Sequence, residues 1–362
     1  MTHHTLYIGD ALEVLRTLPD ESVDAVVTDP PYELGFMSYT WDRSGVAHRP
    51  DVWRECLRVA KPGAHLLSFG GTRTYHRMVC AVEDAGWEIL DMIVWLYGQG
   101  MPKSPELGDG QGTALKPALD PIVLARKPIV GDIKEHLAAH GTGVLNIDAC
   151  RIPANGDDLG GGIVSSRAGG WDRPWKRDPA AVNAAIERGR DKILTAEALG
   201  RWPANVALDP DAAVSLDAQS GVLTSGSRAA GVRKGMGYHG AKGDGGPELV
   251  GSAGGASRFF YVAKASTKDR APYNTHPTVK PLMLMRWLVQ LVTPKGGTVL
   301  DPFGGSGTTI LAAKQLVLSS IYIDLNADYA RIAERRCFEQ REIQEDYTYE
   351  VRDMRREGTA GD

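Results

Sequence analysis

Short apolar runs alternate with amphipathic segments at both ends of this chain, and this alternation constrains its fold more than any other feature. The run Leu6–Gly9 is followed by an amphipathic segment, Ala11–Leu18, and then by a second apolar run, Asp24–Thr28. A strand, a helix and a strand in succession form a βαβ unit, whose strands lie parallel in one sheet. Further strands are expected at Ala64–Phe69, Trp87–Trp95, Pro121–Ala125, Thr298–Leu300 and Ile321–Ile323. The pattern predicts an α/β fold with a doubly wound, mostly parallel sheet.

The alternation stops in the middle of the chain, where the composition changes. Residues 151–260 contain 20 of the 42 glycines and no long periodic segment. We interpret this stretch as a loop-rich insertion that begins after Lys127. The predicted boundaries are 1–130 and 259–340 for the two halves of one α/β domain, 131–258 for the insertion and 341–362 for a charged tail.

Composition narrows the class of protein. The chain has 362 residues, of which 43% are hydrophobic and 24% charged, close to the averages of globular proteins. Apolar stretches such as Ile89–Leu96 are too short to cross a bilayer, and the first ten residues lack the features of a secretory signal. We therefore expect a cytoplasmic protein without membrane association. Four scattered cysteines without a CxxC pair predict neither disulfides nor a metal site.

The net charge of −4 is unevenly divided along the chain. Residues 151–280 contain 18 Lys and Arg against 13 Asp and Glu, whereas the rest of the chain contains 23 against 32. A local excess of this size is compatible with a polyanionic partner, although it does not by itself predict one.

The sequence Asp29-Pro30-Pro31-Tyr32 follows directly on the expected strand Asp24–Thr28. Ligands of open α/β sheets bind at this end of the strands. Two consecutive prolines fix the backbone and remove two N–H donors, which leaves a carboxylate and a rigid carbonyl side by side as acceptors for an –NH2 group. A tyrosine two residues later can stack on a planar ring. Taken alone, the tetrapeptide would be explained by a Pro-Pro turn.

A second motif, Asp301–Thr309 with the sequence DPFGGSGTT, lies between an expected strand and an expected helix. Glycines at such a junction let the backbone approach a ligand while helix N–H groups face it. The motif is neither a P-loop, because no lysine follows the last glycine, nor a GxGxxG turn. Asp324 ends the next expected strand, 23 residues beyond Asp301, where an acid suits a ribose diol. These features predict an adenosine-type site without a pyrophosphate signature.

Together the two motifs resemble those of S-adenosylmethionine-dependent DNA methyltransferases that act on exocyclic amines, and their order resembles the permuted beta class. The segments Gly9–Asp24 and His276–Pro281 (HPTVKP) are also similar to that class, so the resemblance covers residues 5–127 and 259–338. It implies a circularly permuted, seven-stranded sheet of order 3-2-1-4-5-7-6 with strand seven antiparallel. The first five expected strands would be strands three to seven, and the insertion would be the target-recognition region.

The resemblance also implies a cofactor pocket for S-adenosylmethionine. Asp324 would accept hydrogen bonds from the ribose hydroxyls, while Thr278 and Lys280 would approach the methionine carboxylate. Asp10 would lie near the adenine of the cofactor, although a role as a helix N-cap explains it equally well. The full set of implied cofactor residues is Asp10, Ala11, Asp29, Thr278, Lys280, Asp301, Pro302, Phe303, Gly305, Ser306, Gly307, Thr308 and Asp324.

The implied reaction is transfer of a methyl group to N6 of an adenine flipped out of duplex DNA. The amine is a poor nucleophile because its lone pair is delocalised into the ring. Hydrogen bonds to Asp29 and the Pro30 carbonyl would favour a pyramidal nitrogen, and Asp29 would stabilise the positive charge that develops on it. Tyr32 is expected to stack on the flipped ring. The implied catalytic residues are Asp29, Pro30, Pro31 and Tyr32, and no metal is needed.

Three other functions stay open at this point. Methylation of N4 of cytosine is the same chemistry on another amine, and in the family DPPY favours adenine whereas SPPY favours cytosine. A non-catalytic DNA-binding module of the same fold is disfavoured because Asp29, Tyr32 and the glycine motif are intact. A methyltransferase acting on RNA or protein amides is disfavoured by the order of the motifs and the long insertion.

Double-stranded DNA is the expected partner. A further strand is expected within Arg258–Lys264, and the cations at its ends and just after it are candidates for phosphate contacts. These DNA-binding candidates are Arg258, Lys264, Lys268 and Arg270. The segments Trp171–Arg177 and Gly98–Lys116 are further candidates. Dimers are frequent in the resembled class, which makes a homodimer a further expectation. The sequence carries no signal for a recognition site or for a cognate restriction enzyme.

Overall fold

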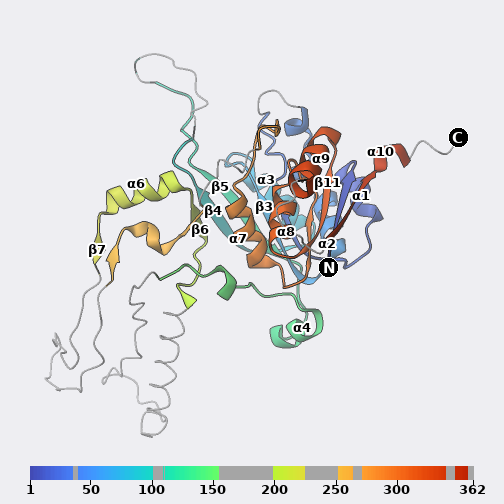
Figure 1. The fold of residues 1–362 in the computed structure, drawn as a ribbon, viewed down its shortest axis with the longest axis horizontal. Coiled ribbons are helices and arrows are strands. Elements are labelled where there is room, and N and C mark those ends of the chain that lie inside the picture. Colours follow the sequence, from blue (N-terminus) through green and yellow to red (C-terminus); the bar gives the residue numbers. More distant parts are fainter. Residues whose placement is uncertain are drawn as a thin grey trace, which may run out of the picture. The chain divides into compact units, whose positions relative to one another are not determined.

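The computed structural model, drawn in Figure 1, describes residues 1–35, 40–100, 109, 111–154, 199–224, 252–263, 271–339 and 347–357. The chain divides into two compact units. The first unit comprises Met1–Cys150, Asn205–Ala212 and Val262–Asp362, and the second comprises Arg151–Ala204 and Ala213–Tyr261. Residues 131–150 and 205–212 fall within the range expected for the insertion, yet they belong to the first unit.

The first unit is built on one mixed sheet that contains all seven predicted strands. These are β1 (Thr2–Ile8), β2 (Val23–Thr28), β3 (Ala60–Phe69), β4 (Glu88–Leu96), β5 (Leu119–Arg126), β10 (Thr298–Asp301) and β11 (Ser319–Asp324). They lie in the order β1-β11-β10-β2-β3-β5-β4. Strand β5 is antiparallel to β3 and β4, and the other neighbouring pairs are parallel. This is the strand order that the resemblance implied.

The described part of the sheet holds ten strands rather than seven. Strand β12 (Tyr347–Asp353) pairs in parallel with β1 and extends that edge. At the other edge, β6 (Val206–Leu208) pairs in parallel with β4, and the order continues to β9 (Tyr261–Val262). Strand β9 lies within the strand expected at Arg258–Lys264. The other two additional strands carry little sequence signal, because β6 has three residues and β12 lies in a charged tail.

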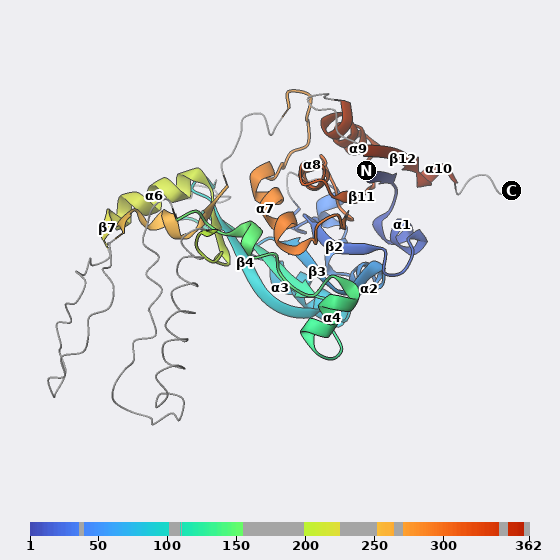
Figure 2. The same ribbon diagram turned by 60° about the horizontal axis from the view of Figure 1, so that its bottom comes forward.

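Helices cover both faces of this sheet, so the doubly wound fold class is confirmed. Figure 2 shows α2 (Pro50–Val59) and α3 (Tyr75–Asp84) on one side of the sheet and α7 (Leu282–Val292) and α8 (Thr308–Gln315) on the other. The remaining described helices and helical turns are α1 (Ala11–Thr17), α4 (Ile133–His140), α6 (Pro210–Ser220), α9 (Ala327–Glu334), α10 (Met354–Glu357), four 3₁₀ turns (Thr40–Arg43, Val46–His48, Asp148–Cys150 and Ala256–Phe259) and a π-turn (Arg335–Glu339).

Alternation within a strand explains how both faces are buried. In β1, Tyr7 packs in the core formed with α1, α2 and α3, whereas Leu6 and Ile8 pack in the core formed with α8 and α9. Successive side chains of a strand point to opposite faces. A parallel sheet covered on both faces needs continuous apolar strands, and accordingly every residue of β2 is buried.

The second unit contains a two-stranded sheet of β7 (Leu223–Thr224) and β8 (Ala253–Gly254). Asp217, on α6, ties this region together by accepting hydrogen bonds from the backbone N–H and the Oγ of Ser257, both at 2.7 Å. The predicted DNA-contact segment Trp171–Arg177 lies outside the described residues. Among the helices that the structure describes, none is long and apolar enough to span a membrane.

Candidate active site

Four acidic side chains lie at the carboxyl ends of neighbouring strands in the sheet of the first unit. Asp10 follows β1 and Asp29 follows β2, while Asp301 and Asp324 are the last residues of β10 and β11. These four strands are neighbours and run parallel, so their carboxyl ends lie side by side. Open α/β sheets bind their ligands there.

The four carboxylates line a cavity of about 1060 Å³ within the first unit. Of the cofactor and catalytic residues predicted from the sequence, only Gly307 is absent from its lining. The predicted residues that line it are Asp10, Ala11, Asp29, Pro30, Pro31, Tyr32, Thr278, Lys280, Asp301, Pro302, Phe303, Gly305, Ser306, Thr308 and Asp324. The unpredicted side chains in the wall include those of Trp41, Tyr97, Asp120 and His276.

The glycine motif makes a tight turn between β10 and α8 that depends on missing side chains. A Cβ atom on Gly304 would lie 2.1 Å from the ring of Tyr322, a contact that real structures do not tolerate. The hydroxyl of Tyr322 donates a hydrogen bond to the Gly305 carbonyl at 2.7 Å and holds the turn against β11. Gly307 precedes α8 with a φ of 79°, in the left-handed region that favours glycine. Sequence reasoning selected Gly305 and Gly307 but missed Gly304.

Asp301 joins the two sequence motifs. Its Oδ1 accepts a hydrogen bond from Thr28 Oγ1 at 2.7 Å, across from β2, and another from the Phe303 N–H at 3.1 Å. The side chain is buried, and this burial raises the pKa of Asp301 to about 6. The carboxylate therefore orients the turn and anchors it to the strand that precedes the DPPY motif.

Asp324 faces the cavity at the end of β11. Its Oδ2 accepts from the Gly305 N–H at 2.8 Å and its Oδ1 from the Asn326 N–H at 2.7 Å. Burial raises the pKa of Asp324 to about 6. Asp10 combines its two expected features, because it lines the cavity and its Oδ1 also caps α1 by accepting from the Leu12 N–H at 2.9 Å.

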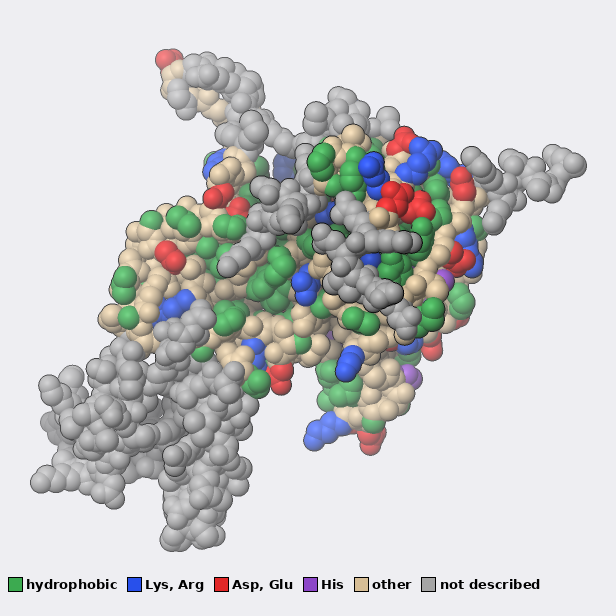
Figure 3. Space-filling view, in the orientation of Figure 1, with side chains coloured by type: hydrophobic (Ala, Val, Ile, Leu, Met, Phe, Trp, Pro, Cys, Tyr) green, Lys and Arg blue, Asp and Glu red, His purple; other side chains and the backbone are tan. Residues whose placement is uncertain are grey.

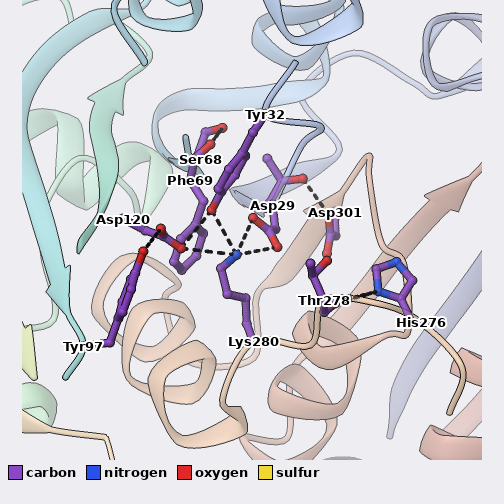
Figure 4. Close-up of polar contacts among 11 residues, drawn as sticks. Asp29, Tyr32, Ser68, Phe69, Tyr97, Asp120, His276, Thr278, Lys280 and Asp301 are labelled. Atoms are coloured by element: carbon purple, nitrogen blue, oxygen red, sulfur yellow. Dashed lines mark hydrogen bonds and ion pairs between the residues drawn. The ribbon is translucent and has the colours of Figure 1, made fainter. Parts of the chain in front are cut away.

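Lys280, just before α7, points into the DPPY end of the cavity (Figure 4). Its ammonium donates to Asp29 Oδ1 at 2.9 Å and Oδ2 at 2.8 Å, and to the Tyr32 hydroxyl at 3.0 Å. The resemblance implied that Lys280 approaches a carboxylate of the cofactor. The carboxylates that surround its ammonium in the structure are those of Asp29 and Asp120, and the implied contact with the cofactor stays a prediction.

Asp120 is a second carboxylate beside Lys280 that the sequence did not reveal. Its Oδ2 lies 3.6 Å from the ammonium and accepts from the Tyr32 hydroxyl at 3.1 Å, while its Oδ1 accepts from the Tyr97 hydroxyl at 3.2 Å. Burial raises the pKa of Asp120, against the opposing effect of Lys280. Burial lowers the pKa of Lys280, but Asp29 and Asp120 outweigh it, so the net shift is upward and the ammonium stays charged.

The HPTVKP segment brings His276 and Thr278 to the same cavity. Nδ1 of His276 lies 2.6 Å from the Thr278 carbonyl oxygen, which closes the segment into a tight turn. This turn leads directly to Lys280, so the contact between His276 and Thr278 helps to fix the backbone from which Lys280 enters the cavity. A histidine was not among the predicted site residues.

Only one of the predicted DNA-binding cations lies within the described residues. The guanidinium of Arg258 lies 4.8 Å from the centre of the Phe259 ring, and Arg201 lies over the same ring at 5.2 Å. Phe259 is exposed, whereas Arg201 and Arg258 are half-buried, and the Arg258 guanidinium also donates to the Leu223 carbonyl. The three side chains form one cluster of the second unit. Lys264, Lys268 and Arg270 lie outside the described residues, as does much of the loop Gly98–Lys116. On the face drawn in Figure 3, the described Lys and Arg side chains are scattered among acidic ones.

The model of the N6/N4 DNA methylase family matches residues 23–335, and the chain belongs to this family. As a member of this family, the protein uses S-adenosylmethionine as its methyl donor and DNA as its substrate. The chain is similar to the type II methyltransferase M.HpaI of Haemophilus parainfluenzae, with 23% identity over 337 residues that cover 91% of this chain and 73% of that protein. M.HindIII of Haemophilus influenzae is 21% identical over 372 residues, which cover 91% and 94%.

The chain is also similar to solved structures. TTHA0409 of Thermus thermophilus, complexed with S-adenosyl-L-methionine, is 19% identical, with a TM-score of 0.47 and coverage of 97% of this chain and 98% of that one. The cytosine-N4-specific PvuII DNA methyltransferase is 15% identical, with a TM-score of 0.49 and coverage of 94% and 89%.

The close approach of Gly304 to Tyr322 predicts a specific loss of stability. Gly304→Ala should lower the free energy of unfolding by about 1–3 kcal/mol, because the added methyl group overpacks a buried turn. Urea denaturation measures the effect. Combining the change with Tyr322→Val, which removes the ring, should cost less than the sum of the two single changes. Strict additivity would show that the ring is not what excludes a side chain at this position.

Proposed function

We propose that this protein is a site-specific methyltransferase that transfers a methyl group from S-adenosylmethionine to the exocyclic N6 amine of an adenine in duplex DNA. The observation that carries the proposal is the geometry at Asp29. Both oxygens of this carboxylate accept hydrogen bonds from one N–H-rich group, the Lys280 ammonium, inside the cavity. An exocyclic amine offers the same kind of donor. The base preference itself rests on the aspartate of the DPPY sequence.

The residues at the other end of the cavity fit the cofactor by their chemistry. When bound, S-adenosylmethionine supplies an electrophilic methyl group carried by a sulfonium. The carboxylate of Asp324, at the edge of the cavity, would accept hydrogen bonds from the ribose hydroxyls, and charged acceptors make such bonds strong. The turn at Gly304–Gly307 would let the backbone approach the cofactor closely. Several carboxylates around one cavity also suit a cationic ligand.

The DPPY residues would prepare the amine for attack. Asp29 and the Pro30 carbonyl would accept its two N–H groups, which favours a pyramidal nitrogen with an available lone pair. The charge of Asp29 would stabilise the positive charge that develops on nitrogen during the transfer. Because the amine cannot be reached inside a duplex, the base must leave the stack, at a cost of a few kcal/mol. Tyr32, in the wall of the cavity, would stack on the flipped ring.

The second unit would supply DNA contacts. Arg201 and Arg258 present two cations on an exposed aromatic ring, an arrangement that suits phosphates or an unstacked base. We propose that this cluster belongs to the target-recognition region.

Nucleoside mass spectrometry tests the proposed reaction directly. Unmethylated duplex DNA is incubated with the protein and S-adenosylmethionine, digested and analysed for modified nucleosides. We expect N6-methyladenine. N4-methylcytosine would keep the fold, the cofactor and the role of Asp29 but overturn the choice of base. If a sample that binds the cofactor by calorimetry produces neither modified nucleoside, the result would contradict the proposed substrate.

Removing the Asp29 carboxylate should separate catalysis from cofactor binding. Asp29→Ala should lower methyl transfer at least on the order of 10²–10³-fold, the usual cost of losing one electrostatic contact in a transition state. Asp29→Asn keeps the size but not the charge, and should be nearly as inactive. Cofactor affinity, measured by calorimetric titration, should change little in both variants. Normal turnover in Asp29→Ala would exclude Asp29 from the reaction.

The raised pKa of Asp324 predicts weaker cofactor binding in acid. Because this pKa is raised to about 6, the carboxylate is charged at neutral pH and takes up a proton as the pH falls through that value. One group of this kind lowers affinity about 10-fold at one pH unit below its pKa. Calorimetric titrations between pH 7.5 and 5 should show this fall. Asp324→Asn should bind more weakly at pH 7.5 and show a flatter profile; a wild-type affinity independent of pH would remove Asp324 from the site.

A further inference from the structure

The target position on Asp29 is already filled in this structure. The Lys280 ammonium donates to both carboxylate oxygens, at 2.9 and 2.8 Å, and its side chain is only 11% exposed. If Asp29 accepts the amine of the target base, as proposed above, that amine and the ammonium compete for the same oxygens. The ammonium must therefore move when the base enters.

A buried ammonium cannot simply be released from its carboxylate. Removing one partner of a buried ion pair leaves an uncompensated charge in a poorly solvated place, which is strongly unfavourable. Such a cost would oppose entry of the base at the step that prepares the reaction. The lysine needs another anion within a short distance of its present position.

Asp120 provides that anion. Its Oδ2 lies 3.6 Å from the ammonium, just beyond hydrogen-bond distance, on the side away from Asp29 (Figure 4). The hydroxyls of Tyr32 and Tyr97 each donate to one of its oxygens, at 3.1 and 3.2 Å, and hold the carboxylate in place. A small shift of the flexible lysine would bring its ammonium into hydrogen-bond contact with Asp120.

We propose that Asp120 is a positioning residue that takes over Lys280 when the target base enters and so leaves Asp29 free to accept the amine. The proposal rests on the proposed function of Asp29. It also explains why two carboxylates surround one lysine. With a single carboxylate, the ammonium would neutralise Asp29 and remove the negative charge that faces the developing positive charge on nitrogen. With two, one negative charge remains.

Steady-state methylation of unmethylated plasmid DNA with labelled S-adenosylmethionine tests this assignment. Asp120→Asn should lower kcat about 10- to 100-fold because Lys280 then stays on Asp29, whereas the KM for the cofactor should change little. Asp120→Glu, which keeps the charge, should retain more activity than Asp120→Asn. The matched control is Asp91→Asn, the same change at an exposed position of β4 outside the cavity, which should leave kcat unchanged.

A double variant distinguishes positioning from a merely structural role. If Asp120 acts by drawing Lys280 away, Lys280→Met added to Asp120→Asn removes the competing ammonium and should raise kcat above that of Asp120→Asn. Independent structural roles would give additive losses instead. A kcat for Asp120→Asn equal to that of the wild type, or a double variant no faster than Asp120→Asn, would overturn the proposal. Failure of the wild-type protein to methylate DNA would instead contradict the proposed function, and either methylated base leaves this test valid.

Discussion

The hydrogen bond from Thr28 to Asp301 is the contact on which the site depends. It joins β2 and β10, through residues that are 273 positions apart, by way of a buried carboxylate. Because the strands run parallel, the bond aligns the residues that follow each of them, and the DPPY sequence faces the glycine turn across one cavity. The same carboxylate also orients the turn through the Phe303 N–H. The DPPY end and the glycine-turn end of the cavity are thereby held by one carboxylate.

Buried charge is the second theme of the site. Asp301 and Asp324 carry pKa values raised to about 6 by burial, and backbone N–H groups and a threonine hydroxyl compensate for their desolvation. At the other end, Asp29, Asp120 and Lys280 form a cluster in which the lysine is shared. Burying charged groups is energetically unfavourable unless each of them has a partner of opposite charge or a hydrogen bond.

Much of the fold was predictable because the local signals agree with one another. Apolar runs, interrupted by amphipathic segments, indicated the seven central strands, and Asp10 and the glycine motif marked the helix starts that follow two of them. Strands of the large sheet that escaped prediction are only three residues long, as β6 is, or carry many charges, as β12 does. Their pairing is decided by a neighbouring edge that offers free backbone groups, which leaves little trace in composition.

The sequence by itself determined the fold class, the family and the residues at the strand ends, because motif residues beside apolar runs must emerge at one edge of a parallel sheet. Only the tertiary structure decided what those residues touch. Asp120 lies near the start of β5, a strand that returns antiparallel between β3 and β4, so no spacing along the chain places it beside Lys280. Gly304 shows the same limit, since its requirement comes from the Tyr322 ring on β11. Contacts between distant strands depend on register and direction, which local patterns do not encode.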